Sequence, residues 1–518
     1  MAVIDFFDRG WMINPEGPAY IMDGRSYSFS AIRDISCRIA QALLARGLQR
    51  EAKVAVWSLN DPIAWTCVLG VWRAGMTWVP VNPRSSLEDN GHILDAFDCE
   101  VLFFQSSFAE AVAELRPRLA RLRHAICIDE DLPDAPILNE FLDGQPVEPP
   151  RITYNPDDVV MLGATGGTTG MPKGVMNTNR NIATFLANYA ATMTYRPGEP
   201  IVNLAAAPMT HTAGNMSLPT TARGGTVVIL PRPDPMALMY AIENSRVTEL
   251  FLPPTVIYNL LSHPAVKESD FTSLRYFMYG AAPMSIEKLR EAIQVFGPVM
   301  VGGYGQMEAF ASISYMSPEE HFIDGRIASD QRLSSCGRPL PLTQVIITDD
   351  NNEPLPTGQS GEICVGGDIV MKGYYKQPDK TAETIIDGWL HTGDIGHLDH
   401  DGYLHITDRK KDMIISGGFN VYPSELEQVI WGHPAVQDCA VIGVPDDKWG
   451  EAVKAVVELK PGMAVEANEL IALCRERLGG VKTPKTVDFM ELLPRSPNGK
   501  VLKKDIRSKY WEKSGRTI

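Results

Sequence analysis

The residue types best suited to chemistry gather in one short segment. Its sequence is Thr165-Gly166-Gly167-Thr168-Thr169-Gly170-Met171-Pro172-Lys173-Gly174, with four glycines, three threonines and one lysine. Glycine lets backbone N–H groups approach an anion closely, and threonine hydroxyls and a lysine ammonium add donors and charge. The segment therefore predicts a loop that binds a polyphosphate. It is not a Walker A loop, in which glycine precedes the lysine and Ser or Thr follows it.

The chain around this segment alternates apolar and amphipathic runs. A strand is expected at 159–164, and a helix is expected to begin at Thr178 or Asn179. Alternation of this kind over roughly the first 330 residues is typical of parallel sheets covered by helices. Further strands are expected at 53–59, 100–104, 226–230, 249–251 and 274–279, and further helices at 29–46 and 63–74.

The pattern changes in the last third of the chain. Short strand-like runs separated by Asp, Asn and Gly turns predict an antiparallel β subdomain, and a mixed pattern follows it. We therefore expect an α/β fold with a large N-terminal domain of two helix-covered mixed sheets plus this β subdomain, 1–410, and a small, mobile α+β C-terminal domain, 411–518. The expected strands are 344–348, 361–365, 402–407, 440–444 and 452–459, with helices starting near Pro423 and covering 466–477.

Composition limits the classes of function. The 518 residues carry a net charge of −15, which disfavours nucleic-acid binding because that rests on Lys and Arg. The eight cysteines form no CxxC pair, so we expect reduced core thiols and no structural zinc. No apolar run is long enough to span a membrane, and the N-terminal residues lack the pattern of a signal peptide. The cytoplasm is the expected location, with peripheral membrane contact left open.

The glycine-threonine segment resembles the phosphate loop of the adenylate-forming superfamily, which includes acyl-CoA synthetases, peptide-synthetase adenylation domains and beetle luciferases. The resemblance covers nearly the whole chain, because further motifs of the family follow in order. They are His211-Thr212-Ala213-Gly214, Tyr304-Gly305-Gln306-Met307-Glu308, Trp389-Leu390-His391-Thr392-Gly393-Asp394, the stretch 408–427 and Pro497-Asn498-Gly499-Lys500. The resemblance implies the acyl-CoA ligase branch, with ATP, Mg²⁺ and coenzyme A as the molecules bound.

The resemblance also implies roles for the nucleotide-binding residues. Tyr304 stacks on adenine, Asp394 accepts from the ribose hydroxyls, Arg409 contacts ribose or phosphate, and Glu308 and Thr168 hold Mg²⁺. One departure stands out, because Met307 replaces the threonine usual in the family, whereas Gly166 in place of serine is minor. The remaining ATP-binding residues implied are Thr165, Gly167, Thr169, Gly170, Lys173, Gly280, Ala281, Ala282, Pro283, Gly303, Gly305 and Lys500.

Several implied roles belong to the C-terminal part. Lys500 enters the active site for adenylation, where its charge stabilises the transition state, and Lys411 is the hinge about which the C-terminal domain rotates. Gly417, Gly418 and Trp449 bind CoA, although packing of Trp449 in the core is a competing interpretation. Acetylation of Lys500 would remove its charge and stop the first step.

The acid itself is less well defined. By resemblance His211 lines the acyl pocket as a catalytic-site residue, but no general base is needed because a carboxylate is already ionised at pH 7. Small residues bordering the pocket, Gly214, Gly302 and Gly303, favour a bulky or elongated apolar monocarboxylate, with a fatty acid preferred.

Other activities remain as alternatives. Aryl, alicyclic or steroid acids are alternative substrates, and a stand-alone acyl-AMP ligase that loads a carrier protein is an alternative activity. No acidic residue closely follows His211 to pair with a substrate ammonium, which argues against activation of an amino acid. A catalytically inactive ATP-binding regulator is a further alternative, and Met307 would then be the substitution that abolished catalysis. A homodimer is a family-level alternative to a monomer.

Overall fold

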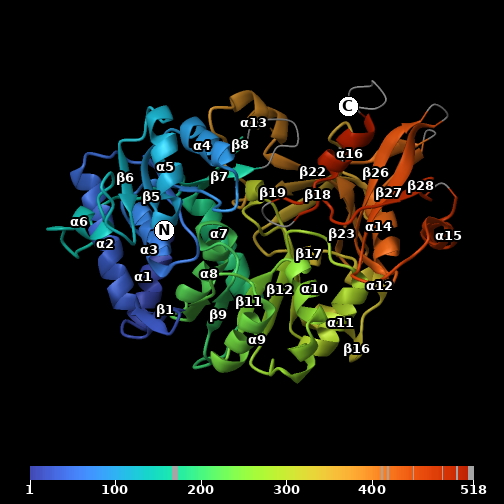
Figure 1. Cartoon of the computed structure of the whole chain (residues 1–518), viewed down its shortest axis with the longest axis horizontal. Helices are drawn as coiled ribbons and strands as arrows, with labels where there is room; N and C mark the ends of the chain where they lie inside the picture. The colour runs from blue at the N-terminus through green and yellow to red at the C-terminus, as the bar shows by residue number, and fades with distance from the viewer. Residues whose placement is uncertain are drawn as a thin grey trace.

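The computed structural model describes residues 1–165, 173–409, 412–416, 419–446, 449–480, 482–496 and 500–511. In this part of the chain, two large sheets with helices around them form the bulk of the molecule (Figure 1), and two five-stranded sheets and one two-stranded sheet complete the fold. This is the α/β architecture predicted from the sequence.

The first large sheet carries the strands that flank the glycine-threonine segment. Its order is β20-β8-β7-β4-β3-β5-β6, and β7 and β8 form an antiparallel pair in which Thr165 lies opposite Lys173. The strands are β3 (Lys53–Trp57), β4 (Thr77–Pro80), β5 (Cys99–Phe104), β6 (His124–Cys127), β7 (Val159–Thr165), β8 (Lys173–Thr178) and β20 (Gly373–Tyr374).

The second large sheet is parallel through its centre and antiparallel at its ends. Its order is β17-β14-β13-β12-β11-β9-β10-β1-β2, with β2, β14 and β17 antiparallel to their neighbours. The strands are β1 (Pro18–Met22), β2 (Arg25–Ser28), β9 (Val202–Ala205), β10 (Thr226–Ile229), β11 (Glu249–Leu252), β12 (Tyr276–Gly280), β13 (Met300–Tyr304), β14 (Ser314–Met316) and β17 (Arg338–Pro339).

Helix α3 (Pro62–Arg73) contacts strands of both large sheets, which explains why it is buried on nearly every face. Asp61 caps its first turn by accepting from Ile63 and Ala64 N–H groups. Trp65, Trp72 and Trp78 meet edge to face, with ring centroids 5.5 to 5.8 Å apart. The other helices of this region include α2 (Phe29–Ala45), α7 (Asn179–Thr192), α8 (Gly214–Thr221), α10 (Pro254–Ser262) and α11 (Ile286–Phe296).

The predicted β subdomain is an antiparallel sheet. Its strands are β18 (Gln344–Thr348), β19 (Gly361–Gly366), β21 (Ile385–Ile386), β22 (Trp389–Leu398) and β23 (Leu404–Arg409). The last strand begins two residues later than the predicted 402–407. Asp399 accepts from the Tyr403 N–H at 2.8 Å and Gly402 adopts φ +80°, so the turn extends to Gly402.

The C-terminal elements, orange to red in Figure 1, lie to one side of the large sheets. They comprise α14 (Pro423–Trp431), α15 (Ala467–Leu478), α16 (Lys503–Trp511), β24 (Ile414–Ser416), β25 (Phe419–Val421), β26 (Val436–Asp446), β27 (Gly450–Leu459) and β28 (Thr486–Phe489). The Ser424 N–H donates to Asp408 of β23 at 3.0 Å, and Gln428 reaches the Met284 carbonyl at 3.4 Å. The predicted hinge, Lys411, lies outside the described residues.

Helix α7 begins at Asn179, one of the two predicted starts, and Thr178 is its N-cap. The sequence did not predict β8, which stands between the glycine-threonine segment and this helix. Its apolar alternation is weak, so pairing with β7 and β20 on both sides defines the strand.

Candidate nucleotide-binding site

One wall of the candidate site lies where two neighbouring parallel strands, β12 and β13, end at the same edge of the sheet. Gly280 of β12 lies opposite Gly303 of β13, and a Cβ on Gly280 would stand 2.6 Å from the Gly303 carbonyl oxygen. Only glycine permits this approach. The segments 280–283 and 304–305 therefore leave the sheet side by side, at the carboxyl ends where α/β sheets bind ligands.

Tyr304, Asp394 and Arg409 form a hydrogen-bonded group. The Tyr304 hydroxyl donates to Asp394 Oδ2 at 2.7 Å, and Arg409 Nε lies 3.3 Å from Asp394 Oδ1. Asp394 and Arg409 are cross-strand partners on β22 and β23. Burial and the adjacent Asp394 raise the pKa of Tyr304 well above its ordinary value, so the phenol is a donor at neutral pH.

This group leaves capacity for a ligand. A carboxylate offers about four acceptor positions, and Tyr304 and Arg409 use two of those on Asp394. Two hydroxyl donors, such as those of a ribose, would fill the others. Asp394 is only 5% exposed, so a bond formed there is shielded from water.

Glu308 and Lys173 both contact the side chain of Tyr374. The Tyr374 hydroxyl donates to Glu308 Oε1 at 2.9 Å, and Lys173 Nζ lies 4.1 Å from the centre of the Tyr374 ring. The sequence predicted roles for Glu308 and Lys173 but not for Tyr374. No local motif marks Tyr374, because its position depends on pairing between β20 and β8.

Glu308 fits the magnesium role implied by the sequence. A hard cation prefers carboxylate oxygens, and no other residue in the described ranges donates a hydrogen bond to this carboxylate. The cation would neutralise phosphate charge when bound. Thr168, the other implied ligand, lies outside the described residues, as do Gly166, Gly167, Thr169 and Gly170.

Comparison with known proteins identifies the family. Residues 7–375 match the family described as AMP-binding enzyme, and residues 425–500 match the AMP-binding enzyme C-terminal domain. The chain belongs to the AMP-binding enzyme family.

Relatives of this AMP-binding enzyme cover more than nine-tenths of its length. It is 36% identical to the medium/long-chain-fatty-acid–CoA ligase FadD8 of Mycobacterium tuberculosis, over 92% of this chain and 85% of that protein. It is also 36% identical to a feruloyl-CoA synthase of an Amycolatopsis species, over 96% and 97%. The structure of the amide bond synthetase McbA from Marinactinospora thermotolerans superposes with a TM-score of 0.89 at 32% identity, covering 98% of this chain and all of that one.

Met307, the departure from the family pattern, packs against β7. A Cβ on Gly163 would stand 2.9 Å from the Met307 sulfur, so the glycine makes room for the thioether. A thioether sulfur is at most a weak acceptor and cannot donate a hydrogen bond.

The glycines predicted to widen the acyl pocket are covered by aromatic side chains of the protein. A Cβ on Gly214 would overlap the Trp65 ring at 2.2 Å, one on Gly302 would meet the Tyr279 hydroxyl at 2.8 Å, and one on Gly303 would lie 3.4 Å from Tyr315. Their missing side chains therefore make room for neighbouring aromatic residues. His211 lies in a short π-helix, Met209–Ala213, and its side chain is not among those described.

The implied C-terminal residues stay predictions. Lys500 is exposed, and its N–H donates to Ser496 Oγ at 3.2 Å across a turn whose tip lies outside the described residues. Trp449 is 38% exposed, with Lys485 Nζ 5.5 Å from its ring centre, which places it at the surface rather than in the core. Gly417 and Gly418 lie outside the described residues.

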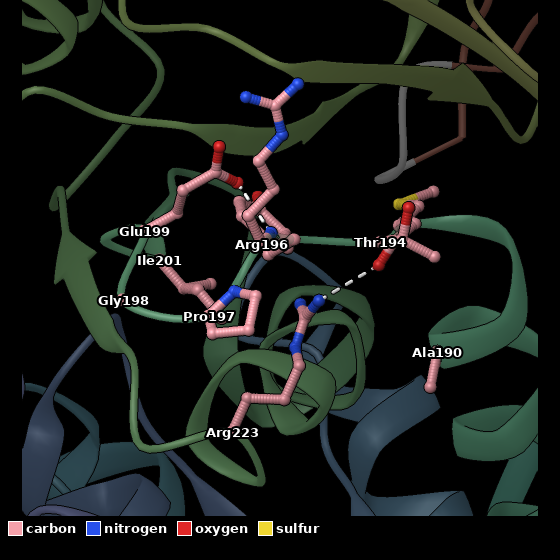
Figure 2. A pocket seen from close by; sticks show the side chains of 10 residues that line it. Ala190, Thr194, Arg196, Pro197, Gly198, Glu199, Ile201 and Arg223 are labelled. Carbon is pink, nitrogen blue, oxygen red and sulfur yellow. Dashed lines mark hydrogen bonds between the residues drawn. The ribbon is translucent and has the colours of Figure 1, made fainter.

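A separate cavity of about 360 Å³ opens at the amino end of β9 (Figure 2). Arg223, in its lining, donates to the Met193 carbonyl at 3.1 Å and pairs with buried Glu249 at 2.9 Å. The nucleotide-site residues follow the carboxyl ends of β12 and β13, which run parallel to β9. The cavity therefore lies at the opposite edge of the sheet and is not part of the nucleotide site.

Two features are absent from the described residues. No helix there combines the length and apolar character needed to cross a membrane. No group of three or more His, Cys, Asp and Glu side chains there is arranged to hold a metal ion.

Proposed function

We propose that the chain is an ATP-dependent carboxylic acid–CoA ligase that forms an acyl-adenylate and then an acyl-CoA thioester, with a fatty acid as its favoured substrate. The observation that carries this proposal is the Tyr304–Asp394–Arg409 group beside the Glu308–Tyr374–Lys173 group. One group suits a nucleoside and the other a polyphosphate, which together match ATP.

In the first step the substrate carboxylate attacks the α-phosphorus of ATP and pyrophosphate leaves. Asp394 and Tyr304 would hold the nucleoside, and Lys173 would pair with the phosphates. We assign to Lys500 the stabilisation of the negative charge that develops in the transition state as the carboxylate attacks. The product is a mixed anhydride, which is a far better acyl donor than the free acid.

In the second step the CoA thiolate attacks the acyl carbonyl and AMP leaves. Surface-exposed Trp449, with Lys485 nearby, offers an aromatic face and a positive charge for the CoA nucleotide. Between the two steps the C-terminal domain would rotate about Lys411. The rotation would take Lys500 out of the active site and bring the surface that carries Trp449 into its place.

The acid is proposed from the relatives. The FadD8 match supports a medium- or long-chain fatty acid, and the feruloyl-CoA synthase match supports an aryl acid as the second candidate. Because aromatic side chains cover Gly214 and Gly302, these glycines no longer favour one acid class over the other.

The test is AMP and pyrophosphate release from ATP over a panel of acids, with and without CoA. The panel contains saturated fatty acids of increasing length, ferulate, benzoate and a steroid acid. We expect CoA-dependent AMP release with one acid class, and fatty acids giving the highest kcat/KM. Pyrophosphate release without any thioester would instead indicate a ligase that loads a carrier protein.

A further inference from the structure

Tyr374 is held rigidly between two elements of the nucleotide site. It lies on β20 opposite Val175 of β8, and its N–H donates to Thr381 Oγ1 at 2.9 Å. The next residue, Tyr375, donates its N–H to the Gly174 carbonyl at 2.8 Å. The ring is 4% exposed, so packing fixes both the backbone and the side chain.

The two ends of this side chain act on different partners. The hydroxyl donates to Glu308 Oε1 at 2.9 Å, and the ring face lies 4.1 Å below the Lys173 ammonium. The hydroxyl orients one carboxylate oxygen and leaves the other to a cation. The ring holds the ammonium by cation–π attraction without neutralising its charge.

Lys173 and Glu308 lie far apart in the sequence, so a third side chain is needed to fix their spacing. Lys173 begins β8 in the first sheet, whereas Glu308 follows β13 in the second. Nothing in their local sequence fixes the separation between the two side chains. The side chain of Tyr374 contacts both of them.

We propose that Tyr374 is a positioning residue that sets the spacing between the metal-binding carboxylate of Glu308 and the phosphate-binding ammonium of Lys173. The inference rests on the proposed function insofar as the ligand is MgATP. Without this hydroxyl, Glu308 would sample several rotamers and bind the cation less well.

The chain supplies a matched control one residue away. The Tyr375 hydroxyl donates to Asp98 Oδ2 at 2.8 Å, so it makes the same kind of bond to a carboxylate outside the site. Tyr375→Phe and Tyr374→Phe each remove one phenolic oxygen from adjacent, partly or fully buried rings. A general loss of packing or stability would affect the two variants alike.

The experiment is calorimetric titration of the full chain with ATP, in the absence of acid and CoA, at limiting and at saturating Mg²⁺. We expect Tyr374→Phe to weaken binding about tenfold at limiting Mg²⁺, as for loss of a hydrogen bond to a charged group. The defect should shrink at saturating Mg²⁺, and Tyr375→Phe should bind as the wild type does. Equal binding by Tyr374→Phe and wild type at every Mg²⁺ concentration would overturn the proposal, as would equal defects in the two variants.

A double-mutant cycle tests whether Tyr374 acts through Glu308. In a Glu308→Gln background, Tyr374→Phe should cause no further loss of ATP affinity, because the carboxylate it orients is gone. Additive losses would contradict the mechanism. No acid is present in this experiment, so it tests MgATP binding alone. If the wild type binds MgATP and Tyr374→Phe binds it equally well, only this inference is overturned. A wild-type chain that binds no MgATP overturns the proposed function as well.

Discussion

At the scale of single residues, the site depends on side chains that each serve two partners. Asp394 accepts from Tyr304 and pairs with Arg409, and both contacts leave acceptor positions for a ribose. The sequence predicted these three residues through their motifs. It could not predict that Tyr304 is hydrogen-bonded to Asp394, because that contact joins strands of two different sheets.

The role of Asp394 gives a prediction at this scale. Asp394→Ala should raise the KM for MgATP by about 100-fold, because a buried acceptor of two hydroxyl bonds is lost. Tyr304→Phe keeps the ring and should raise this KM by roughly tenfold or less. Steady-state kinetics with ATP varied would measure both, with Asp379→Ala, an exposed residue of α13 (Pro378–Thr384), as the control. A normal KM in Asp394→Ala would contradict the assignment.

At the scale of elements, two buried polar contacts hold parts of the fold that the site needs. His321 Nδ1 donates to the Ser317 carbonyl at 2.8 Å, and its Nε2 lies 3.1 Å from the Tyr279 hydroxyl, which covers Gly302. In the C-terminal part, Lys503 of α16 pairs with buried Glu427 of α14 at 2.7 Å, and Glu427 also accepts from the Val441 N–H of β26.

His321 predicts a pH dependence of stability. Burial lowers the pKa of His321 to about 4, whereas the unfolded chain titrates near 6.5. The unfolded state therefore binds more protons in this range, so stability is full above pH 6.5 and falls as the pH drops toward 4. The loss should reach about 3 kcal/mol by linkage. Urea unfolding of wild type and His321→Asn between pH 4 and 7.5 would test this, and parallel curves for the two proteins would refute it.

The Lys503–Glu427 pair predicts a stability effect confined to the C-terminal part. Lys503→Met should destabilise it by about 3 kcal/mol, because Glu427 is left buried without its cation. The double variant Lys503→Met/Glu427→Gln should recover most of this loss. Thermal unfolding followed by calorimetry would measure both. A double variant that is less stable than Lys503→Met would show that the charge is not the cause.

The sequence predicted most elements but not the contacts between distant ones. Strand β18 and the start of α7 fell at the expected residues, because apolar periodicity and an N-cap are local signals. Strand β8 and the role of Tyr374 were missed, since each depends on pairing with strands far away in the sequence. The sequence also could not show that Trp65, from another helix, lies where a side chain on Gly214 would extend, and the place of Gly214 beside the acyl pocket stays a prediction.

At the scale of the whole molecule, the site lies where three sheets meet. Lys173 and Tyr374 come from the first large sheet, Tyr304 from the second, and Asp394 and Arg409 from the β subdomain. Between the described residues, polar bonds from the C-terminal part to this assembly include Ser424 to Asp408 at 3.0 Å, Ser424 to the Thr407 carbonyl, and Gln428 to Met284 at 3.4 Å. Interfaces between domains of one chain are commonly polar, and relative movement is their usual behaviour.

Movement of the C-terminal part gives a prediction at this scale. Lys411→Pro would fix φ at the proposed hinge. We expect adenylation to be retained in part and thioester formation to be lost, because only the second step needs the rotated domain. The two steps are separated by following pyrophosphate release and acyl-CoA formation in single-turnover experiments. Equal loss of both steps would count against Lys411 as the hinge.

The most direct test of the central claim follows an oxygen atom. The acid that supports turnover is prepared with ¹⁸O in both carboxylate positions and allowed to react with unlabelled ATP and CoA. If the carboxylate attacks the α-phosphorus, one labelled oxygen bridges carbon and phosphorus and leaves with AMP. Mass spectrometry should therefore find one ¹⁸O in each AMP and one in each acyl-CoA, whereas unlabelled AMP would contradict an acyl-adenylate intermediate.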